Sequence, residues 1–312
     1  MKKFFLEKKT SIPHKEITNS FNTYFLGGLI FLIGILLINI DNVFKIFLFL
    51  MFFLGLASDK NLIYSPKIRF FLQSAIVITS IIFSEYYIFS TKIIIIDNLL
   101  NDYYFRLFFT TICILILING SNFIDGVNLN LIGYYLIISI ILNIINKSGN
   151  VIFPYNFDFI IFILIIIYIL NLKGFIISGD SGAYAIGYLF GYTLIEISSL
   201  NPLISPIFIV LLLWYPAFEN LFSILRKQKI KKSPLKPDFK HLHQLIYLNL
   251  KKKYSKNITH VNNLTGLIIN LYNLTIFLIG INFYQNSQML ILIIIFNITL
   301  YLKIYFSLSK RN

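Results

Sequence analysis

Ten long apolar runs constrain what this chain can fold into more than any other feature. They lie at about 22–40, 43–57, 68–90, 104–119, 129–146, 157–171, 182–199, 203–225, 264–283 and 289–308. A helix needs about 20 apolar residues to cross the hydrocarbon core of a bilayer. Lipid admits only helices or closed barrels, and continuous runs of this length exclude barrel strands. We therefore expect an all-α polytopic membrane protein with about ten transmembrane helices, forming a single integral-membrane domain over residues 1–312.

The composition agrees with lipid as the main solvent. Hydrophobic residues make up 57% of the chain and charged residues 13%, whereas a soluble domain carries about 25% charged residues. A single cysteine, Cys113, rules out an intramolecular disulfide framework. The stretch Met1 to Asn22 is basic and polar and has no small-residue cleavage site, so we expect no removable signal peptide.

The basic residues predict the orientation in the membrane. All but four of the 27 Lys and Arg residues fall on one side of the predicted topology, and the four exceptions are Lys45, Lys92, Arg106 and Lys147. Because Lys and Arg are retained in the cytoplasm, both termini and the long basic loop 226–263 are predicted to be cytoplasmic, with the chain in a bacterial inner membrane. The net charge of +14 is then a topogenic signal, helped by anionic lipid, and nucleic acid is not an expected partner.

Three aspartates, Asp59, Asp125 and Asp180, lie at the predicted cytoplasmic ends of apolar runs, among Gly, Ser and Asn. Ionisable residues near membrane depth are costly and usually functional. Three carboxylates on one face could converge on Mg²⁺, which takes one or two carboxylates plus substrate phosphates. Neighbouring glycines would let backbone amides approach a phosphate. The alternative is that each Asp only caps a following helix, but three on the same face favour the functional interpretation.

A fourth polar element, His241-Leu-His243, lies in the basic loop. One alternative is a solvated loop with incidental histidines. A zinc site is another, but two ligands without a nearby cysteine leave it incomplete. The basic surroundings favour an anionic substrate instead.

Taken in order, these segments resemble the polyprenyl-phosphate N-acetylhexosamine-1-phosphate transferases. These enzymes are of the glycosyltransferase 4 type and are related to phospho-MurNAc-pentapeptide transferase. The resemblance runs from about Gly27 to Leu245. The last stretch looks more like the GlcNAc-1-phosphate branch than the lipid I branch. The matching segments are the Gly27-Gly28 pair, 55–73 (the Asp-Asp region with its Ser-Pro-Lys-x-Arg tail), 119–129, 173–187 and 216–245.

The sequence departs from the family pattern at several positions. Ser58 stands where the family has the first Asp of a pair, and Asn128-Leu129 stands where it has Asp-Gly. Ala183 replaces a serine, Gln244 replaces a third histidine, and the family's first helix has no counterpart before Gly27. Ser58 cannot act as a base. A phosphate monoester has a second pKa of about 6, so it is largely a dianion at neutral pH and can attack without one.

The resemblance implies transfer of HexNAc 1-phosphate from a UDP-N-acetylhexosamine to undecaprenyl phosphate. The products would be undecaprenyl-pyrophosphoryl-HexNAc and UMP, and the reaction would initiate a surface polysaccharide such as O-antigen. Mg²⁺, with Mn²⁺ as a substitute, is the expected cofactor, and Asp180 is its expected ligand. The catalytic candidates are Asp59, Asp125 and Asp180. The substrate-binding candidates are Asn122, Asn128, Lys67, Lys173, His241 and His243.

Two other functions stay open. A transporter or lipid flippase could use the three aspartates as a cation pathway, although such residues are expected nearer the bilayer midplane, often in broken helices. A catalytically degenerate family member is the second alternative, suggested by Ser58 and Asn128. The sequence leaves open which HexNAc is used (GlcNAc, QuiNAc, FucNAc or another) and whether the chain forms a homodimer.

Overall fold

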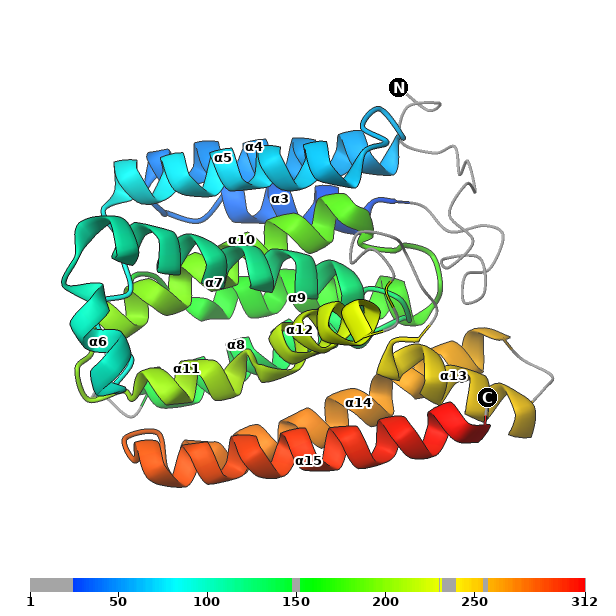
Figure 1. The fold of residues 1–312 in the computed structure, drawn as a ribbon. Coiled ribbons are helices and arrows are strands. Elements are labelled where there is room, and N and C mark those ends of the chain that lie inside the picture. Colours follow the sequence, from blue (N-terminus) through cyan, green and yellow to red (C-terminus); the bar gives the residue numbers. More distant parts are fainter. Residues whose placement is uncertain (1–24, 148–151, 230, 232–239, 255–257, 312) are drawn as a thin grey trace.

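A computed structural model describes residues 25–147, 152–229, 231, 240–254 and 258–311. Every regular element in these ranges is a helix (Figure 1). The helices are α3 (Gly27–Leu36), α4 (Asn42–Asp59), α5 (Pro66–Ser84), α6 (Ile94–Leu100), α7 (Tyr103–Ile124), α8 (Asn130–Lys147), α9 (Phe157–Leu172), α10 (Gly179–Leu200), α11 (Pro206–Leu212), α12 (Trp214–Lys229), α13 (Leu242–Lys253), α14 (Ile258–Ile281) and α15 (Ser287–Arg311). The predicted all-α class is confirmed.

The number of membrane spans is smaller than the predicted ten by length and composition. Six helices within the described ranges are long and apolar enough to cross a bilayer, and a seventh span results if the bent pair α11 and α12 counts as one. Helices α3 and α9 are apolar but shorter. The chain is therefore a multi-pass membrane protein, and the count of ten is not confirmed.

Helix α10 occupies the centre of the bundle. It packs against α3, α4 and α7, and nearly all of its residues from Gly179 to Ile197 are buried. Glycines permit this close packing: a Cβ on Gly28 would lie 2.6 Å from the backbone nitrogen of Gly182, and one on Gly55 would lie 2.4 Å from Cα of Ser181. Small residues allow membrane helices to approach closely, so these glycines fix how α3 and α4 meet α10.

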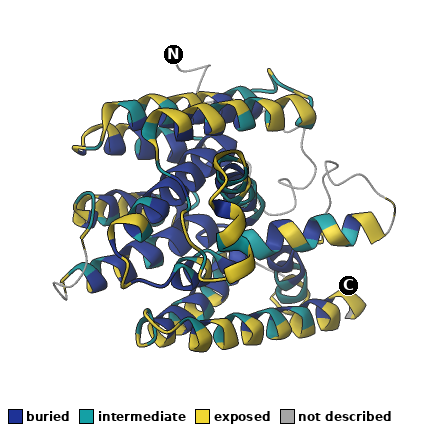
Figure 2. Ribbon diagram, turned by 60° about the vertical axis from the view of Figure 1, so that its left-hand side comes forward, coloured by how far each residue is buried: buried dark blue, intermediate teal, exposed yellow. Residues whose placement is uncertain are grey.

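The peripheral helices present apolar faces outward (Figure 2). In both α5 and α15 only 22% of the most apolar 18-residue stretch is buried. The exposed side chains on α5 and α15 include Phe71, Ile82, Leu292 and Phe296. In a bilayer these faces would contact lipid tails, which carries no hydrophobic penalty.

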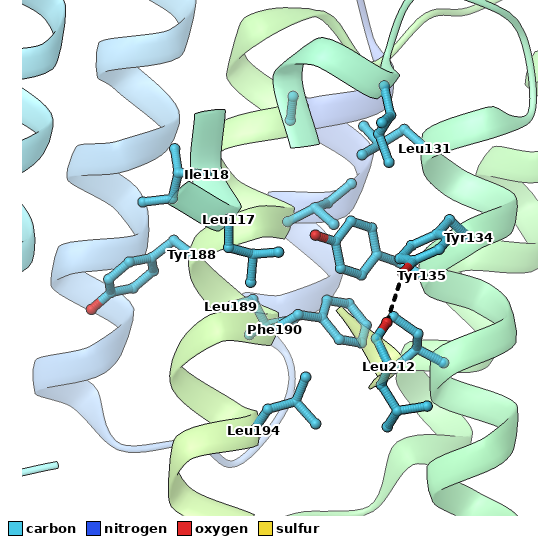
Figure 3. Packing of buried hydrophobic residues seen from close by; sticks show 14 of the residues in the cluster. Leu117, Ile118, Leu131, Tyr134, Tyr135, Tyr188, Leu189, Phe190, Leu194 and Leu212 are labelled. Carbon is cyan, nitrogen blue, oxygen red and sulfur yellow. Dashed lines mark hydrogen bonds between the residues drawn. The ribbon is translucent and has the colours of Figure 1, made fainter. Parts of the chain in front are cut away.

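The chain bends by 73° between α11 and α12. Pro216 has no N–H to donate to the carbonyl of Leu212, four residues earlier. The hydroxyl of Tyr134 replaces that donor at 2.7 Å (Figure 3), and it accepts the N–H of Tyr215 at 3.4 Å. The side chain of α8 thus pairs the backbone groups that the bend leaves free, as lipid requires.

One end of the bundle collects the polar segments. We call it the site end: it holds the last residue of α4, the last residue of α7 and the first residue of α10, with α13 alongside (Figure 1). The segment 226–263, predicted as a long loop, includes the end of α12, the helix α13 and the start of α14, and its residues 230, 232–239 and 255–257 lie outside the described ranges.

We predict that Tyr134→Phe destabilises the fold. The change leaves the buried carbonyl of Leu212 without its donor, which costs about 1–3 kcal/mol of unfolding free energy. Thermal unfolding in detergent would measure the loss. Tyr64→Phe, at a position where the side chain is exposed, is the matched control, and equal stability of the two variants would contradict the role of Tyr134.

Candidate functional site

Asp180 forms the centre of a carboxylate cluster, which we define as Ser58, Asp59, Arg69 and Asp180. It lies in the first turn of α10 and is 3% exposed. Its Oδ2 accepts the hydroxyl of Ser58 at 2.6 Å and lies 3.3 Å from Nη1 of Arg69, which also contacts the Ser58 Oγ at 2.5 Å. Arg69, on α5, therefore neutralises Asp180, and Ser58, where the family has an acid, adds no second negative charge.

Asp59 caps α10, although it ends a different helix. Its Oδ1 accepts the N–H of Asp180 at 2.9 Å and its Oδ2 accepts the N–H of Ser181 at 3.0 Å. Gly179, with a φ of +69°, makes the approach possible, because a Cβ there would lie 2.7 Å from Oδ2 of Asp59. The first N–H groups of a helix have no partner within it and attract negative charge. Asp59 thus caps a helix, but this helix is α10 and not the following helix α5, and the catalytic role of Asp59 stays a prediction.

The last turns of α7 contribute polar side chains to the site end. Asn119 donates to Oε1 of Gln73 on α5 at 3.1 Å. The Oδ1 atom of Asn122 is buried and has no hydrogen-bond partner among the described residues. Asp125, half-buried, is the C-cap of α7. An unpaired buried acceptor costs free energy, so the Asn122 carbonyl group is available to a polar ligand.

Asn128, which follows the end of α7, is hydrogen-bonded to two residues of α14. Its backbone N–H donates to Oδ1 of Asn262 at 2.9 Å, and its side-chain amide donates to Oδ1 of Asn263, also at 2.9 Å. A carboxylate at this position could not donate to Asn263. Asn128, which stands where the family has Asp, therefore donates a hydrogen bond to Asn263 that an ionised carboxylate could not donate.

The histidine cluster, defined as Phe123, Glu219, His241 and His243, forms the second part of the site. Nδ1 of His241 lies 2.8 Å from Oε1 of Glu219, and its ring stacks on that of His243 with centroids 5.7 Å apart. His243 is fully buried, and neither of its ring nitrogens has a hydrogen-bond partner in the described part of the chain. A Cβ on Gly126 would lie 2.1 Å from Nε2 of His243, so His243 packs directly beside the Asp125-Gly126 turn.

The lysines of the site end differ in burial. Lys67 and Lys173, predicted to bind substrate, are both exposed. Lys227, on α12, is 3% exposed, and its Nζ lies 5.9 Å from the ring of Phe123. A buried cation beside the histidine cluster makes this part of the site suited to an anion.

Every sequence-predicted site residue lies at the site end. The structure brings Asp59 to Asp180 and His241 to His243, and it leaves Lys67 and Lys173 at the exposed rim. Sequence reasoning assigned no role to Arg69, Glu219 or Lys227. Glu219 and Lys227 could have been found from the sequence, because charged residues in or beside an apolar run are rarely incidental.

The described residues contain no group of three or more His, Cys, Asp or Glu side chains that could hold a metal ion. What they offer is one buried carboxylate, Asp180, beside one hydroxyl, Ser58. This donor set does not fit an all-protein metal cage. It does fit Mg²⁺, which takes one or two carboxylates and completes its shell with water and substrate phosphate.

Burial and the neighbouring His241 lower the pKa of His243 to about 3, against a partly opposing effect of Glu219. Unfolded His243 takes up a proton below about pH 6.5, whereas folded His243 stays neutral until about pH 3. Its contribution to stability is therefore complete above pH 6.5 and is lost as the pH falls toward 3.

We expect His243→Gln to flatten the decline of melting temperature between pH 7 and 4, with His260→Gln, at an exposed position, as control. An unchanged slope in His243→Gln would contradict this.

Removal of the Asp59 carboxylate should weaken the start of α10. Asp59→Ala is expected to lower the free energy of unfolding by about 0.5–2 kcal/mol, the usual loss of an N-terminal cap. Asp59→Asn keeps one acceptor oxygen and should lose less. Melting temperatures in detergent would rank the three proteins, and an alanine variant as stable as the wild type would argue against the cap.

Two comparisons with known proteins bear on this arrangement. The model of glycosyl transferase family 4 matches residues 42–198, which include the whole carboxylate cluster. An undecaprenyl-phosphate alpha-N-acetylglucosaminyl 1-phosphate transferase of Thermotoga maritima is 25% identical over 224 residues, covering 70% of this chain and 66% of the relative. The family match extends over half of the chain and agrees with the resemblance drawn from the motifs. The chain belongs to glycosyl transferase family 4.

Proposed function

We propose that this protein transfers HexNAc 1-phosphate from a UDP-N-acetylhexosamine to undecaprenyl phosphate, giving undecaprenyl-pyrophosphoryl-HexNAc and UMP. Family membership and the activity for which the Thermotoga relative is named support a polyprenyl-phosphate substrate and a sugar 1-phosphate donor. The product would be the lipid-linked first sugar of a surface polysaccharide such as O-antigen.

One observation carries the proposal: a buried carboxylate, Asp180, is held at a helix N-terminus between a hydroxyl and a guanidinium. This combination suits a phosphoryl-transfer site, where positioning and charge neutralisation supply most of the catalysis. Asp180 would hold Mg²⁺ or Mn²⁺. When bound, the ion would neutralise charge on the donor diphosphate.

The proposed reaction is a phosphoryl transfer in which Ser58 and Arg69 have different roles. An oxygen of the lipid phosphate dianion forms a bond to the sugar-bearing phosphorus of the donor. The bond from that phosphorus to the bridging oxygen breaks, and UMP leaves with the bonding electron pair. Ser58 takes no proton in this step, because the dianion needs no base. Arg69 is placed to bind a phosphate oxygen, and its guanidinium geometry suits that contact.

The histidine cluster would receive the donor. Lys227 offers a buried positive charge, and His241 and His243 offer buried imidazole rings. The Oδ1 atom of Asn122, on α7, offers a hydrogen-bond acceptor. Asp125 is the C-cap of α7 and precedes Gly126, beside which His243 packs. We assign these residues to the diphosphate and the sugar of the nucleotide donor.

The proposed orientation has the site end in the cytoplasm of a bacterium, where soluble nucleotide sugars are made. The distribution of Lys and Arg supports this orientation. A transporter or flippase receives less support, because the three aspartates lie at the ends of helices rather than near the bilayer midplane. Asn128, which suggested a degenerate enzyme, has a structural reason in its bond to Asn263.

Release of UMP would test the proposal. Detergent-purified protein would be given undecaprenyl phosphate and a panel of UDP-HexNAc donors, with Mg²⁺ or with EDTA. We expect metal-dependent UMP release with one or more donors, and a loss of at least about 100-fold in Asp180→Asn, the scale of one preorganised electrostatic contact. Asp158→Asn, an exposed change on α9, is the matched control. Folded wild-type protein that releases no UMP, or an Asp180→Asn variant as active as the control, would refute the proposal.

A further inference from the structure

Glu219 is a buried acid to which the predicted reaction assigns nothing. It lies on α12 and is 0% exposed. Its Oε1 accepts from Nδ1 of His241 at 2.8 Å and from the N–H of Leu242 at 3.4 Å, and its Oε2 accepts the hydroxyl of Tyr301 at 2.7 Å. A buried carboxylate is costly unless it is paired and hydrogen-bonded. Three donors from two other segments compensate this one, so Glu219 fixes where those segments lie.

The bond to His241 also fixes the chemistry of that ring. An ionised carboxylate can only accept, so the hydrogen of this bond belongs to Nδ1 of His241. A hydrogen bond at one imidazole nitrogen sets the tautomer and the ring orientation, and thereby what the other nitrogen can do. We propose that Glu219 is the positioning residue of the histidine cluster, holding His241 so that Nε2, the acceptor nitrogen of this tautomer, is set to accept a hydrogen bond from a sugar hydroxyl of the nucleotide donor. This inference rests on the proposed function for the identity of the ligand.

The C-terminal helix α15 supports Glu219 from the other side. Tyr301 stacks on Tyr305 with centroids 6.1 Å apart. The hydroxyl of Tyr305 accepts from Nη1 of Arg226 at 2.8 Å, and the same Nη1 donates to the carbonyl of Lys240. Two residues of α12, Glu219 and Arg226, thus each join the start of α13 to α15, and Figure 1 shows α15 running toward α13 at the site end.

A purely structural role for Glu219 predicts something different from a positioning role. A buried charge that only holds α12 against α15 would affect every step of the reaction, with or without His241. A residue that acts through His241 loses its effect once that imidazole is gone. Double-mutant cycles separate these cases, because they measure the coupling between two residues directly.

The kinetic experiment uses Glu219→Gln, His241→Gln and the double variant, with kcat and KM measured by UMP release. We expect Glu219→Gln to lower kcat/KM by about 10- to 100-fold, as for residues that orient a ligating histidine. In the His241→Gln background the same change should cost less than about twofold, on the additivity criterion for such cycles. Equal losses in both backgrounds would overturn the proposal. Tyr301→Phe should weaken activity, whereas Tyr272→Phe, which removes a hydroxyl bonded to Asn297, is the control.

A second readout is independent of turnover. Protein labelled with ¹⁵N-histidine carries four imidazoles, and the His241 signals are identified by their loss in His241→Gln. We expect the neutral ring to carry its hydrogen on Nδ1 in the wild type and in Tyr272→Phe, and the Nδ1 signal to shift in Glu219→Gln. A hydrogen found on Nε2 in the wild type would refute the Glu219 assignment even if UMP is released. Absence of UMP release with the hydrogen on Nδ1 would instead refute the proposed function and leave the Glu219–His241 bond established.

Discussion

The start of α10 sets the condition that the rest of the structure satisfies. This helix begins inside the bundle, where its first N–H groups have no preceding turn and little water to pair with. Asp59 comes from the end of α4 to accept two of these hydrogens, and Gly179 leaves the space for its carboxylate. The position of Asp180 follows, because it is the second residue of the helix that this contact anchors. The same interaction that starts the central helix therefore positions Asp180, the residue that we propose as the metal ligand.

The charged side chains of the site end lie in or beside two clusters, the carboxylate cluster and the histidine cluster. In the carboxylate cluster, Arg69 and the hydroxyl of Ser58 compensate Asp180. In the histidine cluster, Glu219 accepts a hydrogen bond from His241 and His243 is kept neutral by burial, while the buried Lys227 lies beside Phe123. The end of α7 contacts α5 through the hydrogen bond from Asn119 to Gln73, and it contacts the histidine cluster through Phe123 and through Gly126, just beyond the helix.

Sequence reasoning predicted the helical class because lipid leaves a spanning chain few alternatives. It also predicted that Asp59, Asp125 and Asp180 share one end, since alternation of spans places every second loop on the same side. It could not predict that Asp59 faces a backbone 121 residues away, or that Arg69 pairs with Asp180, because neither contact has a local pattern. The helix α13 went unrecognised because it is short and basic at its end. The span count exceeded what length and composition support, because α3 and α9 are apolar but short and α10, although long enough, is not apolar enough.

The hydrogen bond between Tyr301 and Glu219 has a consequence for how the protein is made. Its two partners are 82 residues apart, and the intervening chain includes α13 and α14. During synthesis, α3 to α10 can enter the membrane and pack, with the carboxylate cluster complete, while α15 is still untranslated. At that stage the carboxylate of Glu219 lacks the hydrogen bond from the hydroxyl of Tyr301. A chain interrupted before α15 would therefore hold Glu219 with its donors from His241 and Leu242 but without the hydroxyl of Tyr301.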